Sequence, residues 1–113
     1  MSTQRLEPSD LVELFVSASR DFERWSNDFR RGDAAFAKTQ SVVDELDRRG
    51  KLDSLLPLLH HGELVVRAMA AMHLTGPYPN PSTRVLLDAA AEPGLLPLKF
   101  KLWCHKLGLI DEL

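Results

Sequence analysis

The chain has 113 residues, of which 44% are hydrophobic and 27% are charged, and its formal net charge is −2. This length suits one domain and leaves too little chain for two independent cores, while the composition excludes a wholly disordered protein. The near balance of 14 basic and 16 acidic residues also excludes a strongly basic nucleic-acid-binding protein. We therefore expect one domain over residues 1–113.

The residue types favour helices throughout the chain. Leucine (20) and alanine (10) far outnumber valine (7) and isoleucine (1), and β-branched residues are the ones that favour strands. No short segment alternates in the way that a half-buried strand requires. The predicted fold class is all-α. About six helices are indicated by six glycines that each follow an apolar-periodic segment: Gly32, Gly50, Gly62, Gly76, Gly94 and Gly108.

The first two predicted helices are long. The first begins at residues 8–10, where Asp10 and Glu13 resemble a capping box, and it runs for about five turns. The second is capped by Asp33 and ended by Gly50. An apolar side chain recurs every three or four positions in both, at Leu11, Phe15, Ala18, Phe22, Trp25 and Phe29, and then at Phe36, Thr39, Val42, Val43 and Leu46. We expect these two stripes to be core.

Four shorter helices are predicted after Gly50. They run from Asp53 or Ser54 to about His61, from Glu63 to about Leu74, from about Ser82 to Ala91, and from after Gly94 to Leu107. A stiff proline-rich connector covers residues 76–81. The helices then fall into three antiparallel pairs, over residues 10–49, 53–74 and 82–107.

Residues 55–74 resemble a helical repeat. An apolar run opens this block, and Val66, Ala70 and Leu74 lie four apart on one face of the helix that follows. The alanines allow close approach of helices, and neighbouring pairs must stack to bury a common core. The block is similar to a HEAT/armadillo-type repeat, and this resemblance implies a right-handed superhelical stack.

The whole chain is also similar to the small bacterial family known as domain of unknown function 2019. The resemblance rests on the long first helix, on the block at residues 55–74, and on four short sequences: Glu45–Leu46, Arg49–Gly50, Pro93–Gly94 and Leu102–Trp103 with Leu107. This family membership would imply a fold and no activity.

No catalytic or metal site is predicted. The candidate metal ligands are His60, His61, His73, Cys104 and His105. Adjacent residues on a helix point about 100° apart, so neither His60–His61 nor Cys104–His105 makes a chelating pair. Cys104 suits a small core position, and the carboxylates at residues 10–13 and 44–47 suit helix caps and solvated faces. We therefore expect no enzyme, no metal and no cofactor.

One side of the first helix is basic, with Arg20, Arg24 and Arg31 along it and Arg30 beside them. Such a side can bind a nucleic-acid backbone, but acidic residues interleave with these arginines, and phosphate binding needs several uncompensated cations. Nucleic-acid-backbone binding is therefore the alternative function and not the first one.

The second half of the chain is poor in charge. Residues 52–98 carry six charged side chains, whereas residues 1–50 carry eighteen. Two explanations are open. Either a charge-poor end of the stack meets a protein neighbour or a second copy, or the middle pair is sandwiched and for that reason apolar.

We predict a non-enzymatic protein-binding module, such as a small adaptor or an immunity-type protein, with an unknown protein partner or a second copy as its partner. Arg67 would either bond a neighbouring repeat or meet an acidic partner, and Tyr78 lies in the stiff connector. The four expected contact residues are Arg67, His73, Tyr78 and Lys99. The single cysteine and the lack of a signal-peptide or membrane-spanning segment predict a cytoplasmic protein without a membrane.

Overall fold

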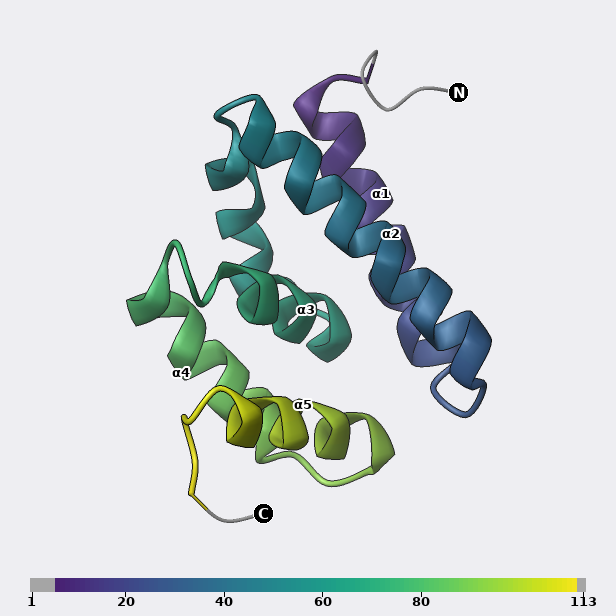
Figure 1. Ribbon diagram of the computed structural model, residues 1–113, viewed down its shortest axis with the longest axis vertical. Coiled ribbons are helices and arrows are strands. Elements are labelled where there is room, and N and C mark those ends of the chain that lie inside the picture. Colours follow the sequence, from purple (N-terminus) through teal and green to yellow (C-terminus); the bar gives the residue numbers. More distant parts are fainter. Residues whose placement is uncertain (1–5, 112–113) are drawn as a thin grey trace. The chain divides into compact units, whose positions relative to one another are not determined.

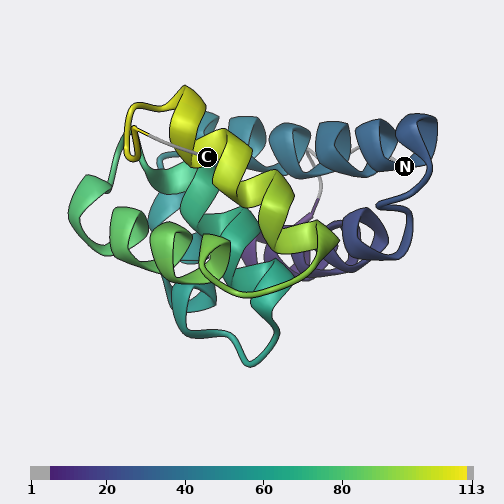
Figure 2. The same ribbon diagram turned by 90° about the horizontal axis from the view of Figure 1, so that it is seen from below.

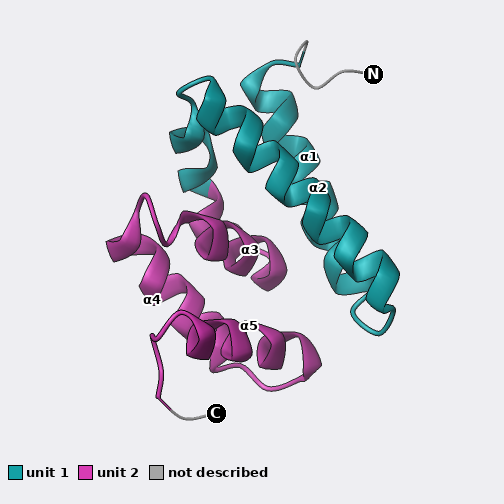
Figure 3. Cartoon of the chain, viewed as in Figure 1, with its two compact units in different colours: residues 1–57 teal, residues 58–113 magenta. Residues whose placement is uncertain are grey.

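The structure is a computed structural model that describes residues 6–111 (Figure 1). Over this part of the chain it contains five α-helices, one 3-10 helix and no strand, which confirms the all-helical prediction. None of these helices is long and apolar enough to cross a membrane. The chain divides into two compact units, residues 1–57 and residues 58–113, which Figure 3 draws in teal and magenta.

In unit 1, helix α1 (Pro8–Arg24) packs against helix α2 (Phe29–Arg48), and the two lie side by side in both views of the ribbon (Figure 1, Figure 2). The predicted apolar stripes supply most of the buried side chains. Phe15 of α1 and Leu46 of α2 are fully buried, and burial of one such side chain contributes about 1.5–3 kcal/mol. The rings of Phe22 and Phe36 extend this contact, with their centroids 6.4 Å apart.

The turn between α1 and α2 comes earlier than the sequence predicts. Asp28, and not Asp33, caps α2 by accepting a hydrogen bond from the backbone N–H of Arg31 (3.1 Å). Gly32 consequently lies inside α2, where an added Cβ would sit 3.3 Å from the carbonyl oxygen of Trp25. The prediction that Gly32 ends a helix is wrong, because this glycine permits a close approach of backbone and does not make a left-handed turn.

Two further details differ at the ends of these helices. Phe29, predicted to close the apolar stripe of the first helix, is the first residue of α2 and is 84% exposed, a consequence of the earlier turn. At the start of α1, Asp10 forms its cap with Glu7 and not with Glu13: it accepts a hydrogen bond from the backbone N–H of Glu7 (3.0 Å).

The third predicted helix is present as a 3-10 helix, η2 (Leu52–His60), and it crosses the junction between the two units along the chain. Pro57 lies inside it. Proline has no N–H to donate and its ring clashes with the preceding helical turn, so this segment disfavours an α-helix and a short 3-10 helix forms in its place.

Unit 2 contains helices α3 (Leu64–Leu74), α4 (Pro79–Ala90) and α5 (Leu95–Lys106). Helix α4 packs against both α3 and α5. Helix α3 is the most buried of the three, since eight of its eleven residues are buried, including three alanines. Leu86 of α4 and Phe100 of α5 are also fully enclosed.

Helix α4 begins at Pro79, three residues before the predicted start at Ser82, so the second half of the proline-rich connector is helical. Pro79 and Pro81 lie in its first turn, where backbone N–H groups have no partner within the helix. Proline therefore does not interrupt the helix at these positions. The left-handed conformation expected at glycines that end a helix occurs at Gly50 and Gly108. Gly94 also has a positive φ (+121°), but it is the N-cap residue of α5 and does not end a helix.

Candidate functional site

Helix α5 has two apolar faces. One is buried in unit 2 and consists of Leu96, Phe100 and Cys104. The other consists of Leu95, Leu98 and Leu102, which are 52%, 47% and 48% exposed. Because successive residues turn by about 100° around a helix axis, the three exposed leucines lie within about 60° of one another, opposite the buried set. We call Leu95, Leu98 and Leu102 the leucine row.

Basic side chains border the leucine row on both sides. The same helical geometry places Lys99 and Lys106 along one edge and Lys101 and His105 along the other. Residues 95–106 contain no aspartate or glutamate. The outer face of α5 is therefore an apolar row between two basic edges.

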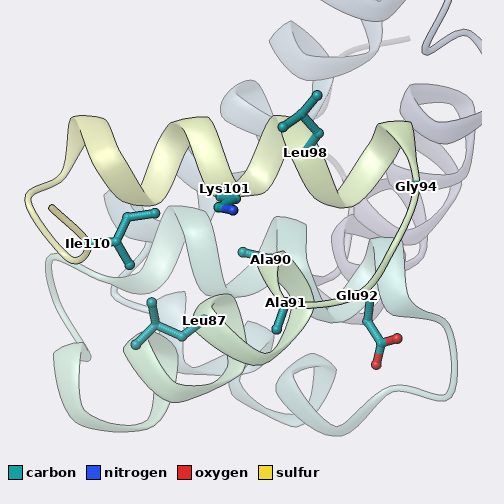
Figure 4. Close-up of a pocket in the computed structure, with 8 residues that line it drawn as sticks. All are labelled: Leu87, Ala90, Ala91, Glu92, Gly94, Leu98, Lys101 and Ile110. Atoms are coloured by element: carbon teal, nitrogen blue, oxygen red, sulfur yellow. The ribbon is translucent and has the colours of Figure 1, made fainter. Parts of the chain in front are cut away.

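A hollow of about 410 Å³ opens beside the row, between α4 and α5 (Figure 4). Its lining residues come from both helices and from the segments that join and follow them: Leu87, Ala90, Ala91, Glu92, Gly94, Leu98, Lys101 and Ile110. Leu98 belongs both to the leucine row and to this lining, so the two features are continuous. The volume lies within the range of sites that take a small ligand or a few side chains.

Lys101 is the cationic group of this hollow. It is half-buried, and no carboxylate among residues 6–111 forms an ion pair with its ammonium group. The other charged residue of the lining is Glu92, which is exposed and lies on the side of the hollow where Gly94 lies (Figure 4). An ammonium group beside an apolar wall attracts an anion strongly, because less water screens it there than at an open surface. The hollow can thus accept an apolar group that carries a carboxylate nearby.

Arg67 lies at a smaller hollow of about 210 Å³, with α3 on one side and α4 on the other. Its Nη1 donates a hydrogen bond to the carbonyl oxygen of His61 (2.8 Å), and His61 Nδ1 accepts one from the backbone N–H of Glu63 (3.0 Å). Arg67 therefore ties α3 to the segment just before it. The structural explanation expected a bond to a neighbouring repeat, whereas His61 lies in the same predicted helix pair as Arg67, residues 53–74.

The other three predicted contact residues also lie in unit 2. Lys99 is at the edge of the leucine row, while His73 lies near the end of α3 and Tyr78 caps α4. His73 and Tyr78 are half-buried, and neither lines the two hollows described above. The four predicted residues thus come from α3, from the N-cap position of α4 and from α5, and Lys99 is the one that borders the outer face of α5.

The sequence reasoning missed the leucine row and Lys101. Leu95, Leu98 and Leu102 have the spacing i, i+3 and i+7, which is typical of one helix face. They alternate with a second set at i, i+4 and i+8, the buried residues of α5. Two apolar sets within one 12-residue helix are the signal that could have located this face.

Contrary to the prediction from the sequence, the four arginines of the alternative function do not share the first helix: Arg20 and Arg24 lie on α1, whereas Arg30 and Arg31 lie in the first turn of α2. All four are exposed. The guanidinium carbon of Arg31 lies 4.1 Å from the centroid of the Trp25 ring, and that of Arg24 lies 5.2 Å from it. Arg31 also lies 3.7 Å from a carboxylate oxygen of Asp28. Two of the four cations that would bind a phosphate backbone are therefore already in contact with Trp25 or Asp28, and Lys106 of α5 has a similar contact with the ring of Trp103 (5.4 Å).

Cys104 is fully buried, with its Sγ 4.0 Å from the carbonyl oxygen of Leu86, which confirms its predicted core position. Burial raises the pKa of its thiol, and a neutral, enclosed thiol is a poor nucleophile. Among residues 6–111, no group of three or more His, Cys, Asp or Glu side chains could hold a metal ion.

Comparisons of the chain with protein-family models, with curated proteins and with solved structures found no match. Its function is therefore inferred from its own residues.

Proposed function

We propose that this protein is a non-enzymatic protein-binding module, of adaptor or immunity type, and that the outer face of α5 is its binding surface. The observation that carries the proposal is the leucine row, three half-exposed leucines on a helix whose opposite face is already buried. Apolar area left in water costs about 25 cal/mol per Å². A helix that is apolar on two opposite sides is therefore typical of an interface.

The surroundings of the leucine row support a protein partner. Protein interfaces commonly have an apolar centre, a pocket that takes an anchoring side chain, and a polar rim. Here the leucine row is the centre, the hollow between α4 and α5 is the pocket, and the basic edges of α5 are the rim.

The HEAT/armadillo-like architecture and the cytoplasmic location belong to the same proposal. Two features of unit 2 would fit a HEAT/armadillo-like repeat. Helix α4 packs against both α3 and α5, and α3 has three buried alanines. The free thiol of Cys104 suits a reducing compartment. In this proposal, the right-handed stack implied by residues 55–74 is a rigid scaffold that docks with little backbone change.

The test is a pull-down from a lysate of the source organism, with retained proteins identified by mass spectrometry. The wild type is compared with Leu98→Asp, which places a charge in the leucine row. Leu14→Asp is the matched control, because Leu14 is similarly exposed but lies on α1 in unit 1. Circular dichroism of each variant confirms that the helices are intact.

We expect a stoichiometric partner that is retained by wild type and by Leu14→Asp, lost with Leu98→Asp, and unaffected by nuclease. Equal retention by the two variants would contradict the proposal. Retention that disappears with nuclease, or falls steeply as salt rises to physiological levels, would favour the alternative, nucleic-acid binding through Arg20, Arg24, Arg30 and Arg31.

A further inference from the structure

The structure also points to the class of partner. We infer that the outer face of α5 binds an acidic amphipathic helix of another protein, and this inference rests on the proposed function. The partner helix would lay its apolar side chains along the leucine row and insert one of them into the hollow between α4 and α5. Its carboxylates would then meet the lysines on the two edges of α5.

Charge gives the first reason. Residues 95–106 carry Lys99, Lys101 and Lys106 together with His105, and no acidic residue. These groups border the leucine row on both sides, so a partner with carboxylates on both sides of an apolar stripe is complementary to it. Lys101 has no ion-pair partner among the described residues, so its ammonium group can receive a carboxylate without losing a bond.

Size gives the second reason. The leucine row spans two helical turns, a length of about 10 Å at 1.5 Å per residue. A stable dimer interface usually buries about 800 Å² on each partner, which is more than three half-exposed leucines can supply. A second copy docked on the same face would also bring the lysines of α5 against one another. A helix of opposite charge avoids this repulsion, and it can bury more area by contacting the hollow and the basic edges of α5 as well as the leucine row.

The hollow between α4 and α5 favours a protein helix over a lipid membrane as the partner of α5. Leucines flanked by lysines are also found in helices that lie on anionic lipid surfaces. Lipid contact, however, does not require a side-chain-sized hollow beside the helix, whereas an anchoring side chain of a protein partner does. This difference favours the protein helix.

The experiment uses three probes against the full chain. The first is a fluorescent helical peptide of about four turns, with leucines along one side and glutamates on both flanks. The second has the same leucines but a lysine in place of each glutamate. The third is vesicles of phosphatidylcholine and phosphatidylserine, measured by co-sedimentation. The variant is Lys101→Glu, and Lys38→Glu is its control, because it makes the same charge change at an exposed lysine of α2.

We expect the wild type to bind the acidic peptide at least about tenfold more tightly than the basic one, with an affinity that falls as salt rises. Lys101→Glu should weaken binding of the acidic peptide about tenfold and strengthen binding of the basic peptide. A merely structural defect could weaken both but could not strengthen either. Lys38→Glu should leave both affinities unchanged.

Equal affinity for the two peptides, binding of neither, or vesicle binding that exceeds binding of the acidic peptide would each overturn the inference. The proposed function fails on a different result, namely that Leu98→Asp retains the same lysate proteins as the wild type. A lysate partner lost with Leu98→Asp, together with equal affinity for the two peptides, would keep the function and reject the acidic helix.

Discussion

Glu45 joins two helix ends of unit 1 through arginines. Its carboxylate accepts hydrogen bonds from Arg48, the last residue of α2, and from Arg49, the C-cap residue that follows. Arg49 also donates to the carbonyl oxygen of Leu6, just before α1. The bonds from Arg48 and then Arg49 lower the pKa of the Glu45 carboxyl from 4.5 to about 2. The folded protein therefore favours the ionised carboxylate.

Stability should depend on pH through this residue. Because the pKa is lower in the folded state, the carboxylate stabilises the fold above about pH 4.5, and this contribution disappears as the pH falls towards about 2. Glu45→Gln should thus lower the urea midpoint near neutral pH, and its difference from the wild type should shrink over this range. Urea unfolding followed by circular dichroism measures both effects.

The control for this prediction is Asp47→Asn, which removes an exposed carboxylate two residues away that has no side-chain partner among the described residues. Its urea midpoint should stay close to that of the wild type at each pH. If the deficit of Glu45→Gln instead persists undiminished in acid, its cause is packing and not the charge of the carboxylate.

At the scale of the helix, Gly50 ends α2. Its φ is +69°, and the two bonds that close the helix are donated by Gly50 N–H to Asp47 (3.0 Å) and by Lys51 N–H to Leu46 (2.8 Å). Nothing lies within 4 Å of a Cβ added there, so the alanine of Gly50→Ala would not clash with a neighbour. We expect Gly50→Ala to lower the free energy of unfolding by about 1–2 kcal/mol, the cost of a left-handed backbone conformation at a residue that has a Cβ.

Thermal or urea unfolding measures this cost, and Gly62→Ala is the control. Gly62 has equally open surroundings but lacks a left-handed φ, so alanine should be neutral or slightly stabilising there. Equal destabilisation by the two substitutions would mean that the conformation of Gly50 is not what ends α2.

The all-helical fold class could be predicted from the sequence, whereas several helix ends and the 3-10 form of residues 52–60 could not. Periodicity locates most of the buried positions of α1 and α2, because apolar spacing follows directly from helix geometry. Asp28 and Asp33 are both suitable caps, however, and the choice depends on Gly32, whose missing side chain permits a close approach to Trp25. That approach is a tertiary contact between α1 and α2, which local sequence does not contain. The same holds for Pro79, which can either break a helix or begin one.

The candidate site was only partly predictable for a similar reason. The low charge of residues 52–98 directed attention to a segment that lies mostly in unit 2, and Lys99, one of the expected contacts, lies at the edge of the leucine row. Which apolar side of α5 is buried depends on where α4 packs, so the sequence alone cannot separate Leu98 from Leu96. The hollow that contains Lys101 likewise exists only once α4 and α5 have come together.

At the scale of the whole molecule, charge is distributed unevenly. Residues 1–57 hold nine basic and eleven acidic side chains, and residues 58–113 hold five of each. Within the second group three of the five basic residues are lysines of α5. A nearly neutral protein therefore carries, in α5, three lysines on one helix without any carboxylate. That local excess, more than the net charge, decides which partner the leucine row can meet.

Because α5 is basic, salt should affect binding of a second copy of this chain and binding of an acidic helix in opposite directions. Two copies meeting through α5 would place lysines against lysines, so we expect a monomer in sedimentation velocity at low salt. Salt shortens the screening length from about 10 Å at 0.1 M to about 3 Å at 1 M. Self-association through the leucine row should therefore increase with salt, because the repulsion between lysines is screened. Binding of an acidic helix should decrease, because the attraction between lysines and carboxylates is screened. Leu98→Ser should abolish the self-association at high salt, and Leu14→Ser should not. A dimer that is already stable at low salt and is dissociated by Leu98→Ser would instead make the second copy the natural occupant of the face.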